Sequence, residues 1–170
     1  AALESLNTED PFDGVITCCD YYLSSAARIA EHFGLPGPSE ACVLVANRKH
    51  LMREALKRAG MPGPEFAVAQ DWQQVLNEAE KIGFPLVVKP VDLCASQLVT
   101  LVSDETALRQ SFEAIHALTH NIRGQERLPL ILLESFLDGP EFSVETITFN
   151  GKTTVIGITD KSLTGQPFFV

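Results

Sequence analysis

Two charged residues in this chain each close an apolar run that is typical of a buried strand. Lys89 follows the run at residues 86–88, and Glu134 follows the run at 130–133. A strand holds its terminal side chain rigidly, so both groups could face a bound ligand. Phosphate oxygens would satisfy a partly buried ammonium, and a carboxylate can accept a hydrogen bond from an exocyclic amine such as that of adenine. The alternative for Lys89 is a side chain that extends into solvent.

Other charged positions could also take part in binding. Lys49 begins an expected helix, where the helix dipole disfavours a cation, and this indicates either a nearby anion or simple exposure. Glu141, Ser143 and Glu145 alternate, so a strand would carry them on one face. The two glutamate carboxylates could bind ribose hydroxyls or a cation such as Mg²⁺, with Glu145 as the candidate metal ligand. The alternative is a strand face turned to solvent.

The apolar periodicity predicts the elements that would position these groups. Helices are expected at 20–33, 39–45, 47–60, 71–82 and 103–118, and strands at 14–19, 66–69, 86–89, 98–102, 130–134, 142–149 and 152–159. Asp20 and Ser103 are expected helix caps. Asn150-Gly151 predicts a hairpin turn between the last two strands. Residues 1–12 are expected to form a loose tail, 119–129 a polar surface connection and 161–170 a loop. This alternation predicts an α/β or α+β fold.

Composition restricts the classes of partner. The 170 residues are 45% hydrophobic and 21% charged, as in a globular protein with a core, and the formal net charge is −9. That charge opposes nonspecific binding to nucleic acid or an anionic membrane. There is no apolar stretch long enough to span a bilayer and no signal-peptide pattern, so we expect a cytoplasmic protein. The four cysteines lack metal-site spacing and are expected to be reduced, in or near the core.

Three segments, in this order and at this spacing, resemble the ATP-grasp ligases. Asn47-Arg48-Lys49-x-x-Met52-Arg53 followed by Gly60-Met61-Pro62 is similar to the helix that opens their nucleotide-binding domain. Residues 83–90, with the sequence GFPLVVKP, are similar to their central strand, and residues 134–141, ESFLDGPE, to their hinge. The resemblance covers residues 13–170. It is strongest to the carboxylate–amine ligases that include amino-acid ligases and carnosine-synthase-like enzymes, of which the chain resembles the N-terminal and central part.

The resemblance implies a role for each matched position. Lys49 and Lys89 would contact the phosphates of ATP, and Glu134 would accept the adenine amine. The backbone of Ser135 and Leu137 would read the edge of the ring. The remaining matched positions are Glu141, which would hold the ribose, and Ser96, which matches a serine of the phosphate-covering loop.

The implied reaction joins a small-molecule carboxylate to an amine, with amino acids as the expected substrates. The carboxylate forms an acyl-phosphate with ATP and the amine then displaces phosphate, while Mg²⁺ neutralises the developing charge. Members of the family commonly form dimers. The implied division is the end of a Rossmann-like pre-ATP-grasp domain (1–46), a small lid subdomain (47–133) and the start of a truncated large subdomain (134–170).

Two departures from the family pattern matter for this hypothesis. The loop at 91–97, which is rich in glycine in the family, contains none here. The family's magnesium ligands and catalytic arginine lie beyond the hairpin, so catalytic residues are expected outside this chain, and the chain is expected to be a fragment. The alternatives are a nucleotide-binding module without catalysis, and a structural or interaction domain with accidental motif matches.

Overall fold

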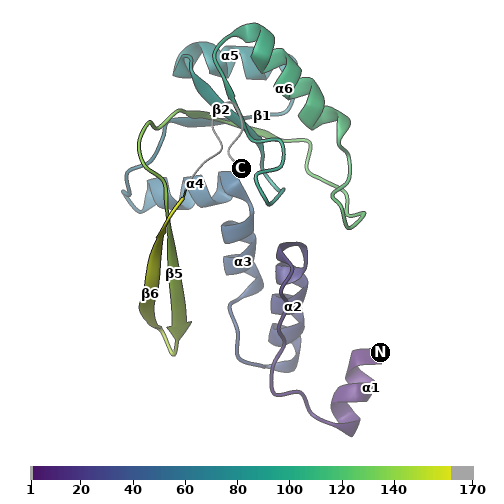
Figure 1. Ribbon diagram of the computed structural model, residues 1–170. Helices are drawn as coiled ribbons and strands as arrows, with labels where there is room; N and C mark the ends of the chain where they lie inside the picture. The colour runs from purple at the N-terminus through teal and green to yellow at the C-terminus, as the bar shows by residue number, and fades with distance from the viewer. Residues whose placement is uncertain (1, 162–170) are drawn as a thin grey trace.

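The computed structural model describes residues 2–161 (Figure 1). The helices are α1 (Ala2–Glu9), the short 3₁₀ helix η1 (Asp20–Tyr22), α2 (Leu23–Phe33), α3 (Glu40–Asn47), α4 (Lys49–Arg58), α5 (Trp72–Ile82) and α6 (Glu105–Ala117). The strands are β1 (Phe66–Ala69), β2 (Leu86–Pro90), β3 (Thr100–Val102), β4 (Ile131–Ser135), β5 (Phe142–Phe149) and β6 (Lys152–Asp160).

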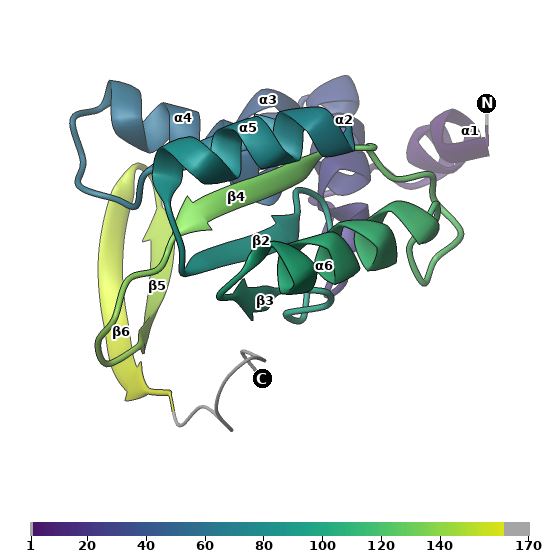
Figure 2. The ribbon, with the colours of Figure 1, turned by 90° about the horizontal axis from the view of Figure 1, so that it is seen from above.

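The core lies on one face of a four-stranded antiparallel sheet. The strand order is β1-β4-β2-β3, and α5 and α6 cover one face side by side (Figure 2). Because successive strand residues point to opposite faces, alternate residues of β2 and β4 enter the core. The buried cluster consists of Ala69, Val75, Ala79, Leu86, Val88, Val102, Leu108, Phe112, Ile115, Ile131 and Leu133. The mixed α and β content predicted from the sequence is therefore confirmed.

The opposite face of the sheet carries the two charged strand ends. In the antiparallel register Lys89 pairs with Leu132, and Val87 pairs with Glu134. Glu134 is thus the diagonal neighbour of Lys89 on the same face, a spacing that long side chains can bridge. Helix α4 lies on this side of the sheet, away from α5 and α6 (Figure 1).

Strands β5 and β6 form a separate two-stranded hairpin that extends away from the main sheet (Figures 1 and 2). Asn150 and Gly151 have φ angles of 48° and 73°, as a type I′ turn requires, so the predicted hairpin is confirmed. Many of its apolar side chains are exposed: Phe142, Val144, Ile147, Phe149, Val155, Ile156 and Ile158.

Helices α3 and α5 begin with side-chain caps, whereas both caps predicted from the sequence are wrong. The Ser39 and Asp71 side chains accept hydrogen bonds from the first turns of α3 and α5. The predicted cap Ser103 is wrong, because the adjacent Asp104 accepts from the backbone N–H of Ala107. Asp20 is also not a cap, since it is the first residue of η1 and no side chain caps that helix.

The N-terminal segment differs most from the prediction. Residues 2–9 form helix α1 rather than a loose tail, and residues 14–19 form no strand. The side chain of Ile16 is 93% exposed. An apolar run becomes a strand only where another strand satisfies its backbone groups, and the described part of the chain places none beside it.

Two further expectations are corrected. The connection at 119–129 is not wholly at the surface, because it contains the buried Arg127. The four cysteines are free thiols, as predicted, but Cys18 and Cys42 are exposed and the other two are half-buried, so they lie outside the core.

The loop expected at 161–170 lies outside the described residues apart from Lys161. Among residues 2–161 no helix is long and apolar enough to cross a membrane.

Candidate nucleotide site

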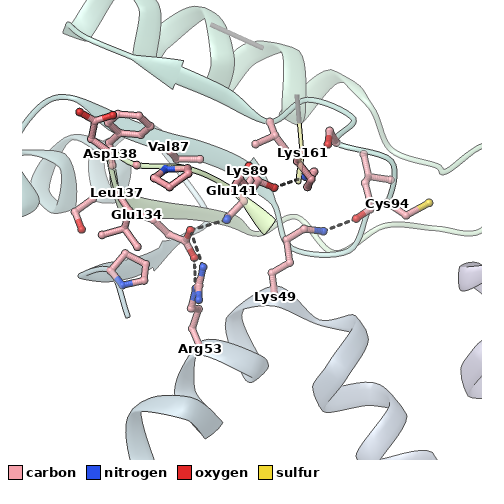
Figure 3. Close-up of a pocket in the computed structure, with 18 of the residues that line it drawn as sticks. Lys49, Arg53, Val87, Lys89, Cys94, Glu134, Leu137, Asp138, Glu141 and Lys161 are labelled. Atoms are coloured by element: carbon pink, nitrogen blue, oxygen red, sulfur yellow. Dashed lines mark hydrogen bonds and ion pairs between the residues drawn. The ribbon is translucent and has the colours of Figure 1, made fainter. Parts of the chain in front are cut away.

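A cavity of about 720 Å³ lies between α4, the open face of the sheet and the segment that follows β4 (Figure 3). Its volume is in the range of small-molecule sites. The lining residues come from α4, β2, the loop after β2, β4 and the hinge after it, with Pro64 from before β1 and Lys161 from after β6. They are Lys49, Arg53, Pro64, Val87, Lys89, Leu93, Cys94, Ala95, Ser96, Val99, Glu134, Ser135, Phe136, Leu137, Asp138, Gly139, Pro140, Glu141 and Lys161.

The cavity brings together the side chains that the sequence singled out. All seven residues predicted to contact the nucleotide line it, namely Lys49, Lys89, Ser96, Glu134, Ser135, Leu137 and Glu141. Glu145 does not line it and is exposed on β5. The proposed binding roles of these residues stay predictions, but their convergence from distant parts of the chain is an observation.

Glu134 is at the centre of an ion cluster. Its Oε1 lies 2.5 Å from Nε of Arg53, and its Oε2 lies 2.5 Å from Nζ of Lys89 and 3.3 Å from Nη2 of Arg53. The side chain of Glu134 is 5% exposed. Burial acts to raise the pKa of this carboxyl, but the hydrogen bond from Arg53 and the charge of Lys89 outweigh it and hold the pKa below its ordinary value. The carboxylate is therefore ionised at neutral pH.

Lys49 faces the same cavity from the start of α4. Its Nζ donates to the carbonyl of Leu93, and its backbone N–H donates to the carbonyl of Val91 at 2.9 Å. Burial, and then the nearby ammonium of Lys89, lower the pKa of Lys49. Because the ammonium of Lys89 disfavours the charged form of Lys49, an anion beside Lys49 would be stabilising.

The loop after β2 is attached to the structure by Asp92. This carboxylate accepts from Nη1 of Arg48 at 3.0 Å, from Nε of Arg127 at 3.2 Å and from the backbone N–H of Leu128 at 2.7 Å. Arg127 also donates to the carbonyls of Ile115 and Leu118. The network joins the start of α4, the end of β2 and the segment before β4, so it fixes Lys49 relative to Lys89.

The loop lacks glycine but still has a glycine-like backbone. Ala95, Ser96 and Leu98 have φ angles of 53°, 52° and 57°, which lie in the left-handed region. A side chain in that region costs about 1–2 kcal/mol because Cβ approaches a carbonyl oxygen. The absence of glycine therefore leaves the turn in place and adds strain to it, with the loop still lining the cavity.

We expect Ala95→Gly to raise the free energy of unfolding by about 0.5–1 kcal/mol, because removal of Cβ relieves the left-handed strain at an exposed position. Urea unfolding measures this change. The matched control is Ala114→Gly at an exposed position inside α6, which should lower the stability by about 1 kcal/mol. Equal destabilisation by both changes would contradict the strain at Ala95.

Two basic residues of the cavity, Arg53 and Lys161, are not among the binding residues predicted from the sequence. Arg53 follows Lys49 by four residues on α4, a spacing that puts both side chains on one face of the helix. Lys161 pairs with Glu141 through both backbone and side-chain contacts across the hairpin. The sequence indicates this contact only through the hairpin register. Glu141 directly precedes β5, Lys161 directly follows β6, and the two strands pair.

Comparison with known protein families gives two matches. A family described as "ATP-grasp domain" matches residues 82–170, and one described as "ATP-grasp N-terminal domain" matches residues 1–37. The first match covers more than half of the chain.

Comparison with individual proteins gives the same picture. The crystal structure of L-amino acid ligase from Bacillus licheniformis is 32% identical with a TM-score of 0.77, over 99% of this chain and 37% of that one. The carbamoyl phosphate synthase large chain of Thermus thermophilus is 30% identical over 73% of this chain and 12% of its own length. The L-arginine-specific L-amino acid ligase of Bacillus subtilis is 22% identical over 87% of this chain and 35% of its own length. The chain thus spans about a third or less of these relatives.

Proposed function

The chain belongs to the ATP-grasp family, and from that premise we propose that it carries the ATP-binding clamp of a carboxylate–amine ligase. The observation that carries the proposal is the convergence of Lys49, Lys89 and the ionised Glu134 on one cavity. Four cationic and three anionic side chains of the described residues line that cavity, in a chain whose net charge is −9. The local positive balance suits a polyphosphate.

In the proposed binding mode, one group of residues contacts the phosphates of the nucleotide and another contacts its base and ribose. Lys49 and Lys89 contact the phosphates, and the loop containing Ser96 covers them. Glu134 accepts the adenine amine, the backbone of Ser135 and Leu137 reads the ring edge, and Glu141 holds the ribose. In this scheme residues 1–46 close a preceding domain, 47–133 form the small lid subdomain and 134–170 begin the large subdomain.

The proposed chemistry is transfer of the γ-phosphoryl group to a carboxylate, followed by attack of an amine and release of phosphate. The cationic side chains would neutralise the charge on the transferring group. The described residues do not build a magnesium site: no three His, Cys, Asp or Glu side chains among them gather as metal ligands, and Glu145 lies away from the cavity. We therefore assign no step to Mg²⁺ on these residues.

Amino acids are the proposed substrates, because two of the relatives are named as L-amino acid ligases. The test is release of ADP by the full-length protein from Mg-ATP with pairs of amino acids. Release that requires both an amine and a carboxylate supports the proposal. Nucleotide binding without turnover on any pair would favour a non-catalytic module, which the glycine-free loop makes a specific alternative. Absence of nucleotide binding would refute both.

We expect Mg-ATP binding to be accompanied by proton uptake at alkaline pH. The pKa of Lys49 in the free protein is lowered by burial and by Lys89, and a phosphate beside it would raise that pKa. Between the two values the bound state holds more protons, so affinity falls as pH rises through the lower pKa and levels off above the higher one. Calorimetry in buffers of different ionisation enthalpy measures the uptake, and Lys49→Met should abolish it. Proton release would contradict the assignment.

A further inference from the structure

The two cations on Glu134 approach it in different ways. Arg53 comes from α4 and places its planar fork along the carboxylate, with Nε on Oε1 and Nη2 on Oε2. Lys89 comes from β2 and places a single ammonium on Oε2 (Figure 3). The Arg53, Lys89 and Glu134 side chains are 23%, 15% and 5% exposed, so all three are largely removed from water.

These two partners would behave differently when a nucleotide binds. Lys89 is a point charge on a flexible stem, whereas a guanidinium is a rigid fork whose donors fix the plane of the carboxylate. Under the proposed function Lys89 turns toward a phosphate, which withdraws one hydrogen bond from Oε2. A carboxylate offers about four acceptor directions, and the fork of Arg53 occupies one on each oxygen. Glu134 would then remain charged and oriented by Arg53, and its Oε2 would be free to accept a further hydrogen bond.

We propose that Arg53 is the positioning residue for recognition of the base: by holding Glu134, it sets the preference of the cavity for a purine with an exocyclic amine. This inference rests on the proposed function. Lys89 and the amine use the same oxygen in turn, so the phosphates draw away the cation that otherwise occupies the acceptor. Binding of the two ends of the nucleotide is thereby coupled through one carboxylate.

The test compares two nucleotides on the full-length protein. The probes are Mg-ATP and the magnesium complex of purine riboside triphosphate, which lacks the amine. The unsubstituted protein should prefer ATP by about tenfold or more, the worth of a hydrogen bond to a charged group. Arg53→Met should lower ATP affinity by about tenfold and change the affinity for the second nucleotide by less than about threefold. Arg53→Lys, which keeps the charge without the fork, should recover part of the preference.

The outcomes separate the inference from simpler roles. An equal loss of affinity for both nucleotides in Arg53→Met would mean that Arg53 only supports α4. A preference for ATP retained in Arg53→Met would mean that other groups hold Glu134. Either result would overturn the inference and leave the proposed function standing. If Arg53→Met does not fold, the Arg53→Lys variant provides the test. An unchanged preference of that variant for Mg-ATP over the second nucleotide would also overturn the inference. Arg58→Met, on an exposed part of the same helix, is the control and should leave both affinities unchanged. Failure of the unsubstituted protein to bind either nucleotide would refute the proposed function itself.

Discussion

Replacing Asp92 by alanine is expected to lower the free energy of unfolding by about 3–5 kcal/mol, although Asp92 does not line the cavity. The side chains of Asp92 and Arg127 are 5% and 4% exposed, so their charges are shielded from water. Removal of the carboxylate leaves the Arg127 guanidinium charged and buried, with one nitrogen, Nη2, already without a hydrogen-bond partner among the described residues. Such an uncompensated charge costs far more than the loss of one hydrogen bond.

Urea unfolding of the full-length protein measures this effect, and Glu78→Ala is the matched control. Glu78 forms an ion pair with Lys81 on the exposed surface of α5, where such pairs contribute about 0–1 kcal/mol. Asp92→Asn, which keeps the shape and part of the hydrogen bonding, should fall between the two. A loss below about 1 kcal/mol in Asp92→Ala would mean that water reaches Arg127 and that the network does not anchor the loop.

The two strands that carry the site could be predicted because the local sequence of each is enough to indicate a strand. The apolar runs before Lys89 and Glu134 are short, are bounded by turn residues and end on a charge, and each becomes a strand of the central sheet. Their convergence is then a consequence of antiparallel register, which places Glu134 diagonally from Lys89. The role of each segment came from the family resemblance, which rests on their order and spacing and which periodicity alone does not give.

What could not be predicted depends on partners remote in sequence. The run at 14–19 has strand composition, but no strand of the described residues lies beside it, and composition does not report a missing partner. Arg53 is 81 residues from Glu134, so its ion pair appears only once α4 is placed against the sheet. The left-handed backbone at Ala95 was hidden because glycine is the usual marker of that conformation, and here an ordinary residue adopts it.

Replacing Lys89 by methionine is expected to weaken Mg-ATP binding by about 100-fold while leaving the chain folded. A charge-assisted hydrogen bond contributes about 1.5–3 kcal/mol, and 1.4 kcal/mol corresponds to a factor of ten in affinity. We take the upper part of that range because the Lys89 side chain is only 15% exposed, so water screens its charge poorly. Methionine keeps the apolar stem, and Arg53 still pairs with Glu134, so the melting temperature should change little.

Calorimetric titration of the full-length protein measures the affinity, with Lys81→Met as the control. Lys81 pairs with Glu78 on α5 and does not line the cavity, so its replacement should alter neither affinity nor stability appreciably. The opposite pattern in Lys89→Met, a marked fall in melting temperature with unchanged ATP affinity, would make Lys89 a structural partner of Glu134 alone. The two measurements report different contacts of Lys89. The affinity reports whether a phosphate uses the Lys89 ammonium, and the melting temperature of the free protein reports how far Glu134 depends on Lys89 when Arg53 still pairs with it.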